Sequence, residues 1–185
     1  MKQANTATEI THSNSLQAVV TDNTDQQKKL QQLTDTAWSF ACTALWNNLE
    51  FSSRETSTAK DKIRSVLQSG DMEKSFLAFC QRVLLARHYV SKNPGHYIPL
   101  PSVWLDETNK RGFAGTESWY NRVIDMRQSL PSYKQEVKAL AEAILELSTE
   151  PSNANYQYWR SYFIDHRSPG LLTLFQQAAV QQLYH

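Results

Sequence analysis

Apolar side chains recur at helical spacing along most of this chain, and no other feature constrains the fold as much. The clearest stretch runs from Met72 to Val90, where apolar residues follow one another in steps of four, three, four, three and four. That spacing places them on one face of an α-helix. No segment alternates apolar and polar residues between hairpin turns as a half-buried strand does. The sequence therefore predicts an all-α fold.

Capping residues and prolines mark where the predicted helices begin and end. In chain order we first expect a helix from a cap at Thr24 to about Asn48, a polar break over 52–58, a short helix ending near Gly70, and a helix capped by Asp71 that stops before Pro94. A single turn capped by Ser102 follows, and then helices that begin at Thr116 and Ser132. After a break at Pro151 we expect a short aromatic helix and a last helix that begins at Pro169.

These elements predict a single compact domain of six or seven helices over 25–185, with a proline-rich central loop. Two small helical bundles joined by that loop are an alternative, although 185 residues leave little room for two independent cores. Residues 1–24 are polar and predict a flexible N-terminal arm. They contain no apolar signal-peptide core, and no stretch is apolar enough to span a membrane, which predicts a cytoplasmic protein without a membrane partner.

Two cysteines, Cys42 and Cys80, lie within apolar helical patterns. They are interpreted as small buried hydrophobes, with a disulfide or a reactive thiol as the alternative. Without a CxxC pair, the sequence does not support a structural zinc site.

The central loop contains the most unusual stretch of the chain, Asn93 to Leu105. Pro99 and Pro101 hold the residues before them extended, and a helical turn that presents Trp104 follows. One interpretation is structural: a stiff segment that fixes the loop to the core. In the other, the segment and the loop around Phe113 line a recognition surface, since loops held by rigid scaffolds often carry function.

The same stretch resembles a known family. The pattern Tyr97-Ile98-Pro99-x-Pro101-x-x-Trp104-Leu105, after a long helix with Arg82 and Arg87, is similar to the YIPxPxxWL segment of phage- and plasmid-type replication-initiator or helicase-loader proteins. The resemblance covers about Phe79 to Asp106, with Asp106 standing where the family usually has Asn. It implies a role in replication of a mobile element, and it carries over no catalytic residue.

Basic residues gather in the middle of the chain. Between Gln81 and Lys138 there are nine basic and five acidic side chains, a local net charge of +4, whereas the whole chain is +1 and the rest is therefore −3. Such an excess favours contact with phosphates, and the interleaved aromatic residues are of the kind that stack on bases. The alternative is that the cations are ordinary solvated helix faces and the aromatics belong to the core.

Catalytic signatures are missing from the sequence. It has no HExxH, no GxSxG, no P-loop and no GxGxxG. Glu142 and Glu146 share a helix face, where paired carboxylates are usually solvated. The prediction is a protein that is not an enzyme and has no cofactor and no metal site.

The leading hypothesis is a non-catalytic helical binding or adaptor protein, associated with nucleic acid in replication of a mobile element. Its candidate partners are DNA and a replication or other protein. The alternative is a protein–protein interaction module or a homodimer, suggested by the crowded aromatic rings between Tyr156 and Phe163. The candidate nucleic-acid contacts are Arg82, Arg87, Lys92, Lys110 and Arg111, and the candidate recognition loop consists of Tyr97, Pro99, Pro101, Trp104 and Phe113.

Overall fold

A computed structural model describes residues 8–92, 98–106 and 131–183. These residues form helices and no strands, which confirms the predicted all-α class. The predicted helix over 116–130 lies outside the described residues. The helices are α1 (Thr8–Trp46), α2 (Ser53–Gln68), α3 (Met72–Lys92), the single turn α4 (Pro101–Trp104), α6 (Pro131–Thr149), α7 (Asn153–Asp165) and α8 (Pro169–Leu183).

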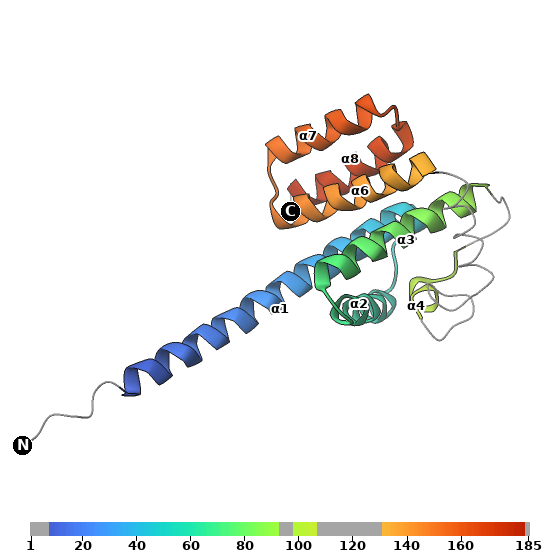
Figure 1. The fold of residues 1–185 in the computed structure, drawn as a ribbon. Coiled ribbons are helices and arrows are strands. Elements are labelled where there is room, and N and C mark those ends of the chain that lie inside the picture. Colours follow the sequence, from blue (N-terminus) through green and yellow to red (C-terminus); the bar gives the residue numbers. More distant parts are fainter. Residues whose placement is uncertain (1–7, 93–97, 107–130, 184–185) are drawn as a thin grey trace, which may run out of the picture.

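The C-terminal half of α1 is the centre of the bundle. It packs against α2 and α3 on one side and against α6 and α8 on the other. Figure 1 shows α7 as the outermost helix, above the α6 and α8 layer, and α4 beside α2 at the opposite side of the molecule.

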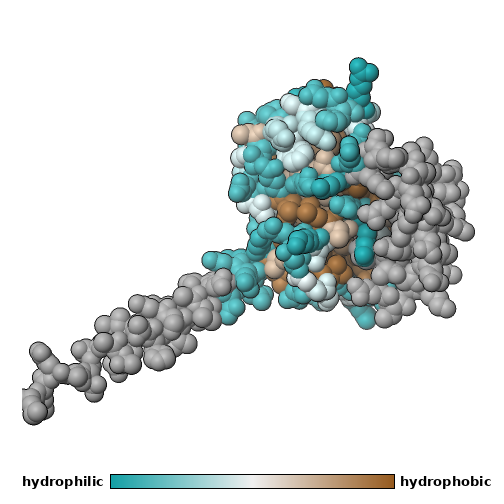
Figure 2. All heavy atoms as spheres, in the orientation of Figure 1, coloured by the Kyte–Doolittle hydropathy of each residue, from teal (hydrophilic) through white to brown (hydrophobic). Residues whose placement is uncertain are grey.

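One hydrophobic core joins the two halves of the chain. The middle of the predicted stripe of α3 is buried, with Phe76, Phe79 and Val83 each no more than 1% exposed, whereas its ends, Met72 and Val90, are half-buried. They belong to the same cluster as Leu140 of α6 and Phe175 of α8. In Figure 2, hydrophobic residues are visible in the middle of the body with hydrophilic residues around them. The prediction of one domain rather than two small bundles agrees with this shared core.

Polar side chains also connect the two halves at one buried position. The hydroxyls of Thr36 on α1 and Ser148 on α6 lie 3.0 Å apart, and the Gln32 amide donates to the Ser148 carbonyl oxygen. Both Thr36 and Ser148 are buried. Because a buried hydroxyl without a partner is costly, this pair favours one register of α6 against α1.

The predicted start of the first helix at Thr24 is wrong. Helix α1 begins at Thr8, and its N-terminal part projects away from the body. From Asn23 onward, its first buried side chain is Leu30. The Thr24 cap failed as a prediction because Ser, Thr and Asn are only moderately poor helix formers. The flexibility predicted for 1–24 stays a prediction.

The predicted polar break over 52–58 is also wrong, because residues 53–58 form the start of α2. The Ser52 hydroxyl accepts a hydrogen bond from the Glu55 backbone N–H at 3.2 Å, which caps the helix at its first turn. The polar composition of these residues predicts a loop, but a serine followed three positions later by a glutamate is typical of a helix start. The next boundary agrees with the prediction, since the Asp71 carboxylate accepts from the Lys74 N–H at the start of α3.

Helices α7 and α8 form a C-terminal hairpin with an aromatic interior. The turn between them passes through Arg167 at φ 50°, and Ser168 precedes Pro169 at the first position of α8, as predicted. The ring of Phe175 lies 5.4 Å from Phe163 and 5.5 Å from Tyr156 between centroids. Trp159 and Phe163 of α7 are buried within the chain, whereas Tyr158 is 63% exposed.

Candidate functional site

The central segment that carries the proline and tryptophan pattern is described over residues 98–106, which we call the strap. Its helical turn α4 begins with Pro101, and the Leu100 carbonyl accepts from the N–H groups of Val103 and Trp104 at 3.0 and 2.9 Å. Leu100 is the capping residue, so the predicted cap at Ser102 is wrong. Proline is well suited to the first helical position because it needs no N–H acceptor there.

Two charged side chains of α2 hold the strap. The Glu55 carboxylate accepts hydrogen bonds from the Ser102 backbone N–H at 2.6 Å and from its hydroxyl at 2.9 Å. Lys62 donates to the Ser102 carbonyl oxygen at 2.8 Å and to the Asp106 carboxylate at 3.0 Å. An acid thus meets the N-terminal side of the α4 turn and a base meets its C-terminal side, which matches the polarity of the backbone at each end.

Aromatic packing fixes the strap to the end of α1. The Trp46 indole N–H donates to the Pro99 carbonyl oxygen at 3.0 Å, and the Trp46 and Trp104 rings meet edge to face with centroids 5.9 Å apart. The Phe51 ring also meets Trp46 edge to face, with centroids 5.9 Å apart. Trp104 is 1% exposed and Pro101 is buried as well. The prediction that Trp104 lines a recognition surface is therefore wrong: its ring belongs to the core, as the structural interpretation of this stretch requires.

The end of α1 depends on two asparagines in the left-handed region. Asn47 and Asn48 have φ values of 50° and 58°, a conformation that asparagine tolerates better than most residues. The Asn48 N–H donates to the Cys42 carbonyl oxygen, and its side-chain oxygen accepts from the Thr43 hydroxyl at 2.9 Å. This turn directs the chain toward α2 and leaves Leu49 62% exposed.

The predicted nucleic-acid contacts are distributed between described and undescribed parts of the chain. Arg82 and Arg87 both lie on α3 and are half-buried, and Lys92 is the last residue of that helix. The Arg87 guanidinium points to the Ala44 carbonyl oxygen at 3.5 Å, at the C-terminal end of α1. Arg87 therefore contributes to the contact between α3 and α1, in addition to any contact with nucleic acid. The remaining predicted contacts and loop residues, Lys110, Arg111, Tyr97 and Phe113, lie outside the described residues.

Many other cations in the described part of the chain are matched by acids. Each of these pairs is only partly buried, and ion pairs of this kind contribute little to stability. They nevertheless reduce the positive potential that the basic residues would otherwise present. The pairs are Lys29 with Glu73, Lys60 with Asp35, Lys62 with Asp106, Arg64 with Asp61, Lys74 with Asp71 and Lys138 with Glu142.

Both cysteines are free thiols in a buried or half-buried position, as the sequence predicts. Burial raises the pKa of Cys42 to about 12 and also raises the pKa of Cys80, with Lys60 opposing the shift at Cys42. Because the thiolate is the nucleophile, neither residue is suited to nucleophilic catalysis near neutral pH.

No protein-family model, curated protein or solved structure matches the sequence. Among the residues that the structure describes, no group of His, Cys, Asp and Glu side chains is arranged to hold a metal ion. None of the helices in these parts of the chain combines the length and apolar character needed to cross a bilayer.

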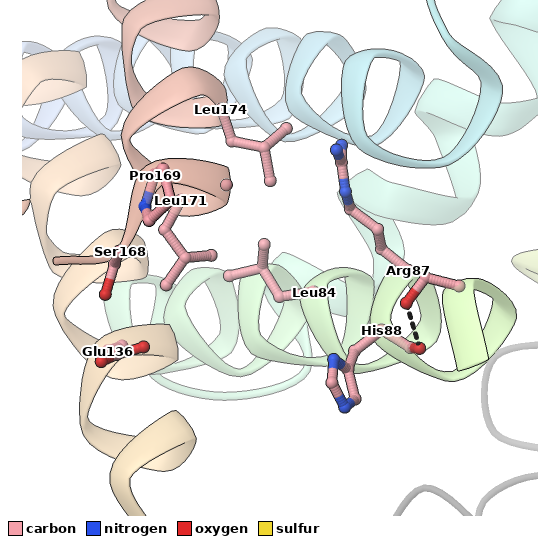
Figure 3. Close-up of a pocket in the computed structure, with 10 residues that line it drawn as sticks. Leu84, Arg87, His88, Glu136, Ser168, Pro169, Leu171 and Leu174 are labelled. Atoms are coloured by element: carbon pink, nitrogen blue, oxygen red, sulfur yellow. Dashed lines mark hydrogen bonds between the residues drawn. The ribbon is translucent and has the colours of Figure 1, made fainter.

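A cavity between α3, α6 and α8 was not predicted from the sequence. It has a volume of about 260 Å³ and is lined by charged, polar and apolar side chains, among them Arg87, Glu136 and Leu171 (Figure 3). These residues are separated by up to about ninety positions along the chain, so no local pattern brings them together. The only sequence signal for it was the predicted start of α8 at Pro169, whose first residues form part of the wall.

Proposed function

We propose that this chain is a non-catalytic, all-helical adaptor that binds nucleic acid in the replication of a mobile element. The observation that carries the proposal is the attachment of the strap at three points, through Glu55, Lys62 and Trp46. A segment that is fixed to a rigid bundle loses less conformational entropy on binding than a free segment does. Asp106, held by Lys62, stands four residues before Lys110.

Phosphate contact by the central cations is the physical basis of the proposed binding. We assign this role to Arg82, Lys92, Lys110 and Arg111, and we leave Arg87 out because its guanidinium faces α1. Each neutralised phosphate releases condensed counterions, so the affinity should fall steeply with salt. The resemblance of residues 97–105 to replication proteins supports the biological setting, and the buried Trp104 indicates that this motif fixes the loop rather than stacking on bases.

Fluorescence anisotropy with labelled single- and double-stranded DNA tests the proposal. Between about 50 and 200 mM salt we expect log affinity to fall linearly with log salt. The double variant Lys110→Ala, Arg111→Ala should reduce the slope by roughly 1.4–1.8, because each lost phosphate contact changes it by about 0.7 for single strands and about 0.9 for duplex.

The matched control is Lys138→Ala. Lys138 lies on α6, where its ammonium is 3.5 Å from Glu142, and its removal should leave the slope unchanged. Absence of binding to both forms of DNA at 50 mM salt would contradict the proposal, as would an equal loss of slope in the control.

A protein partner or a second copy of the chain is the second candidate. Leu49 and Leu100 are 62% and 58% exposed, and the hydrogen bond from Trp46 to Pro99 brings their segments together. Exposed leucines beside an aromatic cluster are typical of protein interaction sites.

Light scattering separates a homodimer from the other possibilities. If the leucines form a self-contact, the mass should exceed 21.2 kDa and return to that value in the double variant Leu49→Ser, Leu100→Ser. Circular dichroism should be unchanged, because exposed side chains contribute little to stability. A monomer mass for the unmodified chain at all concentrations would contradict the homodimer.

A further inference from the structure

The turn between α7 and α8 has an arginine at the position where many helices end in glycine. The Arg167 N–H donates to the Ile164 carbonyl oxygen at 3.0 Å, and the Ser168 N–H donates to the Phe163 carbonyl oxygen at 3.2 Å. This pair of bonds is the Schellman motif, in which the residue after the helix cap adopts the left-handed conformation. Arg167 is that residue, with φ 50°. An arginine therefore adopts the backbone conformation for which glycine is best suited.

The neighbouring contacts hold Arg167 in this conformation. The Ser168 hydroxyl donates to the His166 carbonyl oxygen at 3.2 Å. The His166 ring stacks on Tyr162 with centroids 4.0 Å apart, and its Nδ1 lies 2.8 Å from the Tyr162 carbonyl oxygen. Strained residues persist where the surrounding structure determines their conformation in this way, and they cluster at functional sites.

The fold gives no reason for an arginine at this position. The left-handed conformation costs a residue with a Cβ more than an exposed cation gains from the C-terminal end of a helix dipole. Glycine at position 167 would therefore suit the turn better than arginine does. A residue that is unfavourable for stability is often explained by its function.

The side chain of Arg167 is available to an external anion. The residue is exposed, and none of the salt bridges in the described part of the chain includes it. Asp165, the acid closest to it along the chain, is exposed as well and is likewise absent from the salt bridges of these residues. A guanidinium can bind two phosphate oxygens at once through parallel N–H groups. Arg167 is thus suited to contact a phosphate.

The α7–α8 turn lies beside the C-terminal end of α3. Ser168, which directly follows Arg167, lines the same cavity as His88 and Ser91 of α3. The next residue after Ser91 is Lys92, the end of α3 and one of the residues to which we assign a phosphate contact. In Figure 1 the turn is at the same end of the bundle as the C-terminus of α3. The position of the turn is therefore continuous with the proposed interface.

We propose that Arg167 contacts a phosphate of the bound nucleic acid and extends the interface from the central segment to the α7–α8 turn. This inference rests on the proposed function, since Lys92 and the other central cations supply the remaining contacts. It adds a residue from the C-terminal hairpin, about sixty positions away from the nearest of them along the chain.

The variant Arg167→Gly tests the proposal, because binding and stability should change in opposite directions. In the anisotropy titrations with duplex DNA, the salt slope should fall by about 0.9, the value of one phosphate contact. The affinity at low salt should fall several-fold. The midpoint of urea unfolding should rise, because glycine relieves the left-handed strain.

Two control variants separate the charge from the backbone. Arg167→Lys keeps the positive charge and the strained backbone, so the salt slope and the urea midpoint should both stay close to those of the unmodified chain. Lys74→Ala removes a cation that is 84% exposed at the other end of α3, and it should leave the slope unchanged.

DNA binding with an unchanged salt slope in Arg167→Gly would overturn this inference and leave the proposed function intact. An equal fall of the slope in Arg167→Lys would also overturn it, because the positive charge would then not be the cause. So would a lower urea midpoint in Arg167→Gly, which would show that the arginine stabilises the turn. Absence of DNA binding by the unmodified chain would contradict both proposals together.

Discussion

Replacing Trp104 with alanine is expected to lower the free energy of unfolding by about 3–5 kcal/mol, the range measured when large buried aromatics are truncated. The ring is 1% exposed and lies edge to face with Trp46. Alanine would leave a void between the strap and the end of α1, and packed interiors relax only partly around such voids. Urea unfolding followed by circular dichroism measures the change as a shift of the midpoint.

Leu100→Ala is the matched control, because it truncates a side chain on the same strap that is 58% exposed. We expect a change within about 0.5 kcal/mol. Trp104→Phe keeps an aromatic ring in the core, so its decrease in the free energy of unfolding should lie between those of Trp104→Ala and Leu100→Ala. If Trp104→Ala lowered the free energy of unfolding no more than Leu100→Ala does, the strap would not be part of the core.

Much of the fold follows from local pattern. The α3 stripe from Met72 to Val90 has a strict helical period, and the structure places the helix at Met72–Lys92. Ser168 before Pro169 marks the start of α8 for reasons that are local to the backbone. Periodicity and capping act over one or two turns, so a single sequence is sufficient to identify them.

Prediction failed where composition was used in place of capping geometry. Residues 52–58 are polar and were interpreted as a break, yet Ser52 caps a helix whose buried face, with Ala59, Ile63 and Leu67, becomes apolar only after its first two turns. The prediction at Thr24 failed for a related reason. Threonine favours the capping position, but it also occurs inside helices, so the residue type alone does not show where a helix begins.

The strap illustrates what a sequence does not contain. Its prolines and tryptophan indicated a stiff segment, and both a structural and a recognition role were compatible with them. The choice depends on partners far away along the chain: Glu55 and Lys62 of α2 for the backbone, and Trp46 of α1 for the ring. The cavity has the same origin, since only the packing of α3 and α6 brings Arg87 and Glu136 into one lining.

Those long-range contacts connect the fold to the proposed function. The strap buries Trp104 and Leu105 in the core and ends at Asp106, which Lys62 holds. Burial of these two side chains contributes most of the stability of this attachment, and the ion pair fixes the position of Asp106. The charged residues of the proposed interface follow directly, so a weakened attachment should alter DNA affinity even without loss of a basic residue.

Replacing Glu55 with glutamine is expected to lower the free energy of unfolding by about 1.5–3 kcal/mol, the value of hydrogen bonds to a charged group. The carboxylate accepts from both the N–H and the hydroxyl of Ser102, and the amide offers one oxygen and two donors in its place. Ser102→Ala removes only the hydroxyl and should cost about 0.5–1.5 kcal/mol. Because the two residues are in direct contact, the double variant should be less destabilised than the sum of the single variants.

The matched control on the same helix is Asp61→Asn. Asp61 is 65% exposed and pairs with Arg64 three positions later, so its loss should cost no more than about 1 kcal/mol. Chemical unfolding of the unmodified chain, the two single variants Glu55→Gln and Ser102→Ala, and the double variant gives the coupling energy between Glu55 and Ser102 directly. Additive effects would show that the carboxylate does not bind the Ser102 hydroxyl, because residues that share a hydrogen bond do not act independently. Two results together would identify Glu55 as a positioning residue: a double variant less destabilised than the sum of the single variants, and weaker DNA binding by Glu55→Gln at an unchanged salt slope. The slope stays the same because the number of phosphate contacts is unchanged, whereas their geometry is altered.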